Sequence, residues 1–116
     1  MVKVLVLFGI PNDTDSFDRY FENTHCPLLK KIPALEAIGI NVVEGAMTGE
    51  SDVYRIVELQ FASESAMQEG LNSEAGQTMA RDFGGFASGG VSVLISRWTS
   101  YWRPDEPPRA PHQTAS

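Results

Sequence analysis

The chain begins with an almost unbroken run of aliphatic residues. Residues 2–8 read VKVLVLF, and Gly9 and Pro11 interrupt the run immediately afterwards. A short run of β-branched and aliphatic residues that ends in such breakers is typical of a strand with both faces buried. We therefore expect residues 2–8 to form a central strand that needs cover on both sides.

The apolar period changes from strand-like to helical after polar cap candidates at residues 12–15. The apolar positions that follow at helical spacing are Phe17, Tyr20, Phe21, Leu28, Leu29 and Ile32. Pro33 is expected to end this helix. Pro27 has no backbone N–H and crowds the carbonyl of Asn23, so the helix should kink or restart beside His25.

Two alternating segments then predict a β-hairpin. Apolar residues alternate from residue 38 toward Met47, and the polar residues 49–52 precede a third strand at residues 53–61. Alternation places on one face of this strand Val57, Leu59 and Phe61. It places on the other face Tyr54, Ile56, Glu58 and Gln60.

A second helical region and a fourth strand complete the pattern. Ser63 suits an N-cap, and apolar residues continue at helical spacing to Phe83, with an interruption expected within residues 70–73. The glycines at residues 84–85 are expected to end the helix. Residues 91–98 are again apolar at nearly every position, as a strand buried on both faces would be.

The order strand, helix, strand, strand, helix, strand is the split βαβ pattern of a ferredoxin-like α+β sandwich with a four-stranded antiparallel sheet. Two helices cover only one face of such a sheet. A second copy of the chain, packed sheet to sheet about a two-fold axis, would cover the other face, so we predict a homodimer with the architecture of a dimeric α/β barrel. We assign residues 1–102 to this domain and residues 103–116 to an extended proline-rich tail, either disordered or laid on a partner subunit.

Composition narrows the range of partners and compartments. The 116 residues include 15 acidic and 9 basic side chains, a net charge of −6, which argues against nucleic acid and anionic membrane as partners. The single cysteine cannot form an intrachain disulfide, and the first apolar run is too short for a signal peptide or a membrane span. We expect a cytoplasmic protein.

His25 is the polar residue best suited to chemistry. It follows Phe21 by four residues and precedes Leu28 by three, so it points along the apolar face toward the sheet. Two interpretations stay open: a core histidine bonded to a carbonyl, or a general acid or base with a reference pKa of about 6.5. No partner for it is obvious in the sequence.

The other candidates carry less specific signals. Tyr54, at the start of the third strand, is placed to orient or polarise a ligand. Glu58 lies in the middle of that strand and is either catalytic or structural. We expect a structural salt bridge across the dimer, for which Arg55 or Arg97 could supply the positive charge. Cys26 points about 100° away from His25, so we expect an inert buried thiol rather than a nucleophile. The sequence has no spaced cluster of metal ligands, and we expect no metal and no cofactor.

The aromatic residues suggest a ligand pocket as well as a core. Phe83 and Phe86 flank a glycine-rich segment and either roof an apolar cavity or pack in the core. We predict that four phenylalanines line the pocket: Phe8, Phe21, Phe83 and Phe86. Trp98, Tyr101 and Trp102 cluster after the last strand, where aromatic residues often serve an interface.

The chain resembles the EthD family, named for ethyl tert-butyl ether degradation, within the dimeric α/β barrel superfamily. The resemblance runs from Met1 to about Trp98. It rests on Leu7-Phe8-Gly9, on Phe17 to Tyr20 followed by His25-Cys26-Pro27-Leu28, on residues 55–61, on Ser73-Glu74-Ala75-Gly76-Gln77, and on residues 82–91. It implies the ferredoxin-like fold, a homodimer, and a cavity between helices and sheet that His25 and Tyr54 line. Family members accompany oxidative breakdown of ethers, and related barrels include cofactor-free monooxygenases, isomerases and haem-handling proteins.

These observations lead to three functional hypotheses. The first is a protein that binds a small apolar, oxygen-bearing metabolite, as a cofactor-independent oxidoreductase (monooxygenase-like) or isomerase in oxidative catabolism, with His25 as the proton-transfer residue. The second is a noncatalytic accessory or carrier protein to an oxygenase system, because few ionisable groups surround the predicted pocket. The third is a haem-binding protein with His25 as axial ligand.

Overall fold

In the computed structural model, which describes residues 1–107, four antiparallel strands form one sheet in the order β2-β3-β1-β4. The strands are β1 (Val2–Gly9), β2 (Leu35–Val42), β3 (Val53–Phe61) and β4 (Val91–Arg97), and the helical segments are α1 (Thr14–Tyr20), η1 (Phe21–His25), α2 (Cys26–Leu29), α3 (Glu64–Asn72) and α4 (Glu74–Phe86). The topology confirms the predicted ferredoxin-like α+β fold. Residues 108–116 of the predicted tail lie outside the described residues.

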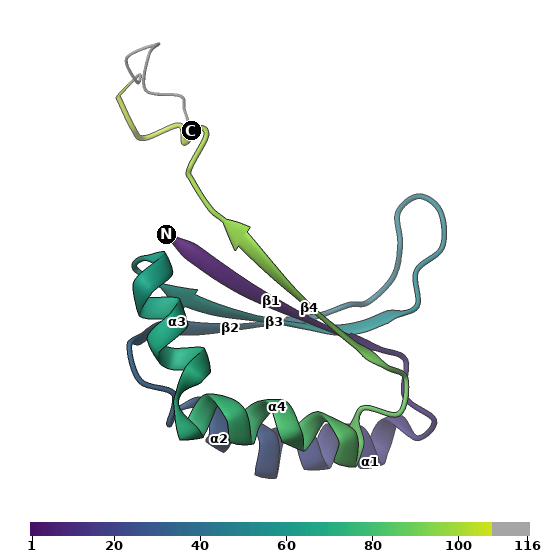
Figure 1. The fold of residues 1–116 in the computed structure, drawn as a ribbon. Coiled ribbons are helices and arrows are strands. Elements are labelled where there is room, and N and C mark those ends of the chain that lie inside the picture. The colour runs from purple at the N-terminus through teal and green to yellow at the C-terminus, as the bar shows by residue number, and fades with distance from the viewer. Residues whose placement is uncertain (108–116) are drawn as a thin grey trace.

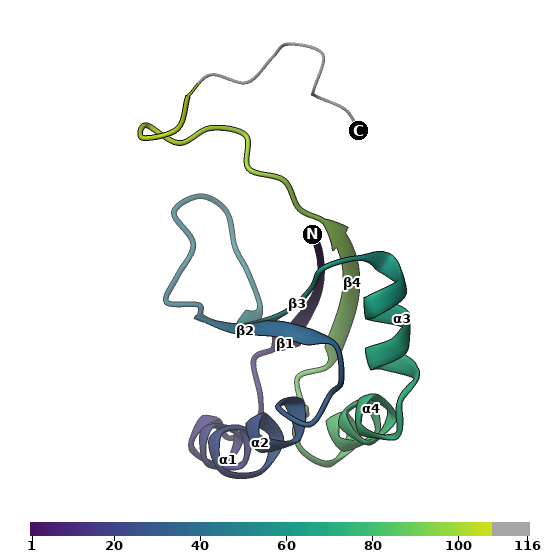
Figure 2. The ribbon, with the colours of Figure 1, turned by 90° about the vertical axis from the view of Figure 1, so that its left-hand side faces the viewer.

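The helices gather on one side of the sheet. Figures 1 and 2 show α1, α2 and α4 together below the strands, whereas the loop between β2 and β3 and the segment after β4 project on the opposite side. The core lies between the helices and the central strands β1 and β3, where Val4, Val6 and Phe8 stand opposite residues 59, 57 and 55. Burying each such apolar side chain contributes roughly 1.5–3 kcal/mol.

The helical region around Pro27 changes its hydrogen-bond pattern rather than simply bending. The segment η1 is a π-helix, and the backbone N–H of Cys26 donates to the carbonyl of Phe21, five residues earlier. A π-helical turn inserts one extra residue and so changes which carbonyls face the missing N–H of Pro27. The predicted restart beside His25 is therefore confirmed, with α2 beginning at Cys26.

Element boundaries follow the sequence prediction in one place and depart from it in three, of which the first is the end of α2 at Leu29 instead of at Pro33. The interruption within residues 70–73 is confirmed, because Ser73 caps α4 by accepting the Gly76 N–H at 3.0 Å. The second strand ends at Val42 rather than near Met47, since residues 43–52 form a loop instead of continuing the ladder. The glycines at residues 84–85 do not end the helix either: α4 continues through both to Phe86.

Candidate functional site

His25 ends the π-helical segment and points into the protein, as its spacing predicts. Its side chain is about 1% exposed. Four aromatic rings surround the imidazole, with centroid distances of 6.0 Å to Phe8, 6.1 Å to Phe21, 5.5 Å to Phe83 and 4.7 Å to Phe86. The helix restart at Pro27 therefore positions a titratable ring in an almost wholly aromatic environment.

Asp82 on α4 is the partner that sequence reasoning missed. Its Oδ2 lies 2.9 Å from His25 Nδ1, and its Oδ1 accepts the Tyr20 hydroxyl at 2.6 Å. An ionised carboxylate only accepts hydrogen bonds, so Nδ1 carries the proton and Nε2 presents its lone pair. The hydrogen bond at Nδ1 therefore fixes which ring nitrogen carries the proton. The arrangement suits a base with a fixed tautomer.

Burial and hydrogen bonding keep these groups neutral near pH 7. Burial lowers the pKa of His25 below its ordinary 6.5, and Asp82 opposes that shift without reversing it. The hydrogen bond to Asp82 raises the pKa of Tyr20 above its ordinary 10.0, with burial as a smaller cause. Tyr20 therefore stays a donor, and the imidazole stays free to accept a proton.

Tyr54 belongs to a second cluster, on the helix side of the sheet. Phe8 pairs with Arg55 while Gly9 pairs with Val53, so Tyr54 is the extra residue of a β-bulge. The bulge corrects the alternation-based prediction that Tyr54 shares a face with residues 56, 58 and 60. It turns Tyr54 toward Phe17, whose ring centroid lies 5.3 Å away.

Asp18 of α1 holds this second cluster together. The Tyr54 hydroxyl donates to the Asp18 carboxylate at 3.0 and 3.1 Å, and Arg55 Nη2 donates to Asp18 Oδ1 at 2.7 Å. Burial is the main cause of a raised pKa at Tyr54, followed by the bond to Asp18. The cluster fixes α1 against β3. Tyr54 contacts the ring of Phe17, which in turn contacts three of the rings around His25.

Glu58 is an ion-pair residue, but its partners differ from those expected. Arg55 is taken by Asp18, and Glu58 instead accepts from Asn41 Nδ2 at 2.8 Å and from Lys3 Nζ at 3.0 Å. These two bonds, Asn41 first, lower the pKa of Glu58. Elsewhere, burial raises the pKa of the partly buried Cys26 thiol, so the thiolate is disfavoured.

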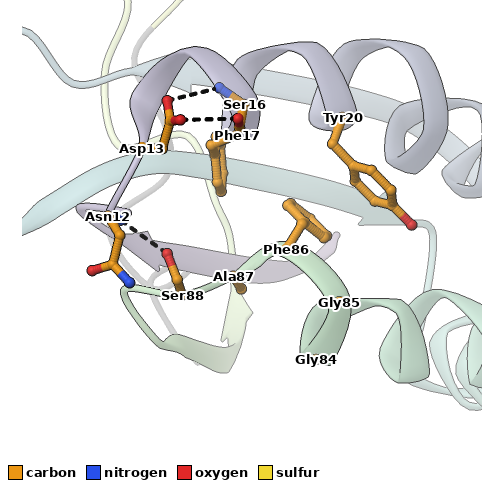
Figure 3. Close-up of a pocket in the computed structure, with 10 residues that line it drawn as sticks. All are labelled: Asn12, Asp13, Ser16, Phe17, Tyr20, Gly84, Gly85, Phe86, Ala87 and Ser88. Atoms are coloured by element: carbon orange, nitrogen blue, oxygen red, sulfur yellow. Dashed lines mark hydrogen bonds between the residues drawn. The ribbon is translucent and has the colours of Figure 1, made fainter.

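An open pocket of about 360 Å³ lies between the start of α1 and the end of α4. It is lined by Asn12, Asp13, Ser16, Phe17, Tyr20, Gly84, Gly85, Phe86, Ala87 and Ser88. Figure 3 shows Phe17 and Phe86 pointing toward one another across it, from α1 and α4. Polar groups of Asn12, Asp13 and Ser88 stand at one end of the pocket.

Of the phenylalanines predicted to line a pocket, Phe86 alone lines this one. Phe8 and Phe21 are core residues, at 0% and 2% exposure, and Phe83 packs against the core. His25 and Tyr54 lie behind Phe86 and Phe17 and do not line it. That these residues contact a ligand remains a prediction. Asn12, Ser16 and Ser88 were missed because nothing local marks them; the turn that joins α4 to β4 brings them together.

The sheet order and the one-sided helical layer define the chain as a ferredoxin-like α+β protein. Residues 11–90 match the family model of the EthD domain, and the chain belongs to the EthD family. The resemblance inferred from the sequence motifs is confirmed.

A relative and a solved structure match the chain over most of its length. It is similar to an uncharacterized 11.0 kDa protein of the thcB-thcC intergenic region in Rhodococcus erythropolis, with 28% identity over 96 residues that cover 83% of this chain and 93% of the relative. It superposes on an EthD family protein of Bacillus halodurans with a TM-score of 0.80 and 29% identity, covering 85% and 99% of the two chains.

A more distant structure shares the fold alone. SnoaB of Streptomyces nogalater, a cofactor-independent oxygenase, matches with a TM-score of 0.59 and 11% identity over 90% of this chain and 97% of that one. No helix among the described residues is long and apolar enough to cross a membrane.

Proposed function

We propose that the protein binds a small, largely apolar metabolite that carries an oxygen function, in the pocket between α1 and the end of α4. His25 then accepts a proton from that molecule. In a cofactor-independent isomerisation the imidazolium returns the proton at another position, and in a cofactor-independent oxidation molecular oxygen takes the electrons of the deprotonated ligand. The observation that carries this proposal is the 2.9 Å bond between His25 Nδ1 and Asp82, which holds the imidazole in the tautomer whose Nε2 carries a lone pair. A neutral imidazole held in one tautomer by a carboxylate is the arrangement that general bases use.

The chemistry of the pocket favours a neutral ligand. The rings of Phe17, Tyr20 and Phe86 offer apolar and stacking contact. Asp13 is the charged lining residue, and hydrogen bonds from Ser16 lower its pKa, so it is an anion at neutral pH. A carboxylate ligand would meet this charge without a cation in the lining to offset it, which favours phenols, ketones, lactones and ethers.

A thermal-shift screen of such compounds, followed by turnover assays, tests this function. A ligand at a hundred times its dissociation constant should stabilise the protein by about 2.7 kcal/mol. Turnover should be lost in His25→Gln and persist in Cys26→Ser, a control one residue away whose thiol bonds to nothing described. Turnover that survives in His25→Gln would contradict the role of His25.

The noncatalytic carrier is the second candidate, and one observation favours it. Phe86 stands between the pocket and His25, so a ligand bound in the pocket as it is would touch no imidazole. Under this alternative, compounds bind with equal affinity to wild type and to His25→Gln, and no rate enhancement is measured with the isolated protein.

We also propose that two copies pair through their helix-free sheet faces. Register places on this face Leu5, Leu7, Ile56 and Leu94, together with the Lys3–Glu58 ion pair. An aliphatic patch on an uncovered sheet favours a partner with a similar surface, and a two-fold axis provides one.

A further inference from the structure

Phe86 touches both halves of the candidate site. Its ring lines the open pocket, stacks on Tyr20 at a centroid distance of 5.0 Å, and lies 4.7 Å from the imidazole of His25. Figure 3 shows this ring projecting from the end of α4 toward α1. The proposed base and the proposed binding space are therefore separated by one side chain.

The residues before Phe86 weaken the helix that carries it. Gly84 and Gly85 lie inside α4, where each glycine disfavours the helical state about fivefold relative to alanine. Neither has a positive φ, and a Cβ on either would meet no atom within 4 Å. Gly70 and Gly76 differ, because a Cβ on either would collide with its neighbours. Packing explains Gly70 and Gly76 but does not explain the glycine pair.

The chain is fixed again immediately after this turn. Asn12 N–H donates to Ser88 Oγ at 2.9 Å, and Gly9 N–H donates to the carbonyl of Gly90 at 3.0 Å. Gly9 and Gly89 approach so closely that a side chain on either would strike the other's backbone. Any local opening at Gly84 and Gly85 is therefore confined to residues 84–87. The hydrogen bond from the Ala87 N–H to the Phe83 carbonyl closes this last turn.

We propose that Phe86 is the access-determining residue of the site, carried on a hinge formed by Gly84 and Gly85. Local opening of the last turn of α4 moves the ring away from His25 and joins the pocket to Nε2. The inference rests on the proposed function, since it explains how a ligand in the pocket reaches the base. The size of the path that Phe86 vacates would then limit which ligands react.

Chemical modification of His25 tests the hinge without any ligand. The chain has two histidines, so a His112→Asn background leaves His25 as the single histidine. Diethyl pyrocarbonate transfers an ethoxycarbonyl group to an unprotonated imidazole nitrogen and releases ethyl carbonate, and the modified histidine is the product that is followed. Phe86→Ala should raise the modification rate by about tenfold or more. The pair Gly84→Ala with Gly85→Ala should lower it by up to about 25-fold, because helix propensity closes the turn by about fivefold for each residue.

Two controls keep this test decisive. Phe83→Ala removes a ring of equal size that also contacts His25 but does not line the pocket, so its effect should be much smaller than that of Phe86→Ala. Hydrogen exchange of the Ala87 amide should slow several-fold in the double alanine variant, which reports closure of the turn rather than filling of the pocket. The double variant introduces no clash, so it also covers the case in which Phe86→Ala fails to fold.

Each outcome bears on one claim. Equal modification rates in wild type and the double alanine variant, or equal increases in the Phe83 and Phe86 variants, would overturn the hinge. If the rates change as expected and no compound binds wild type, then the hinge stands and the proposed function fails. If compounds bind and turn over while the rates do not respond, then the function stands without the hinge.

Discussion

At the scale of single residues, the candidate site depends on one carboxylate with two donors. Asp82 accepts from Tyr20 and from His25, and so ties α1, η1 and α4 together through 2.6 and 2.9 Å hydrogen bonds. The helical period of the sequence predicted that His25 points inward. It could not predict Asp82, 57 residues away, because pairing across two helices depends on how the helices pack and not on either period.

The lowered pKa of His25 predicts a specific pH dependence of stability. Below pH 6.5 the unfolded chain protonates this imidazole and the folded chain resists, so the unfolded state binds more protons. The free energy of unfolding should therefore fall as the pH drops from 6.5 toward the lowered folded pKa, by about 1.4 kcal/mol for each unit of lowering. Urea unfolding at a series of pH values between 7.5 and 5.0 measures the free energy of unfolding. The part of its decrease that comes from His25 should be absent in His25→Gln.

Asp82→Asn should lower the pKa of His25 further. The carboxylate raises that pKa through its hydrogen bond and its charge, and an amide of the same shape keeps the contact without the charge. NMR titration of the imidazole resonances in wild type and variant measures the direction. An unchanged or higher His25 pKa in Asp82→Asn would mean that the Asp82 carboxylate does not stabilise the protonated imidazole.

At the scale of elements, the sequence predicted the order and type of every strand and of both helical regions, because their apolar periods differ clearly. Its errors fall where one residue breaks a period. The β-bulge at Tyr54 moves that side chain to the helix side of the sheet. The restart of the helix beside His25 was predicted, but its form, a π-helical turn before Pro27, was not. The prediction from helix propensity also put the end of α4 too early. The helix continues through Gly84 and Gly85 because Phe86 packs against residues such as Phe17.

Glycines in the two long helices should respond oppositely to alanine. A Cβ on Gly70 of α3 would lie 2.7 Å from the Phe61 ring and 2.8 Å from the Pro33 carbonyl, so Gly70→Ala should destabilise the fold by about 1–3 kcal/mol. A Cβ on Gly84 meets nothing, so Gly84→Ala should stabilise by up to about 1 kcal/mol. Chemical denaturation of both variants measures the contrast; equal effects would contradict the packing of α3 against the end of β3.

At the scale of the whole molecule, the fold leaves one sheet face without helices. The predicted double burial of β1 requires cover there, and within one chain Leu5 and Leu7 are only half-buried while Leu94 is 50% exposed. Figure 2 shows the β2–β3 loop and the segment after β4 projecting beyond this face, so they would flank whatever covers it. Sequence patterning could indicate that the face needs cover, but not what covers it, because an aliphatic surface identifies no unique partner.

A charge on this face, at the middle of the edge strand β4, should separate the proposed dimer without unfolding the chain. Leu94→Asp puts a carboxylate beside Leu5, its cross-strand neighbour, where a second sheet would bury the charge without a partner. Light scattering at micromolar concentration should give twice the chain mass for wild type and the single chain mass for the variant, with circular dichroism unchanged. Thr78→Asp is the matched control, since it adds the same charge on α4, on the opposite side of the sheet. If wild type is a single chain, or if the Leu94 variant still pairs, then the helix-free face is not the interface, and the half-buried aliphatic residues of β1 would need another explanation.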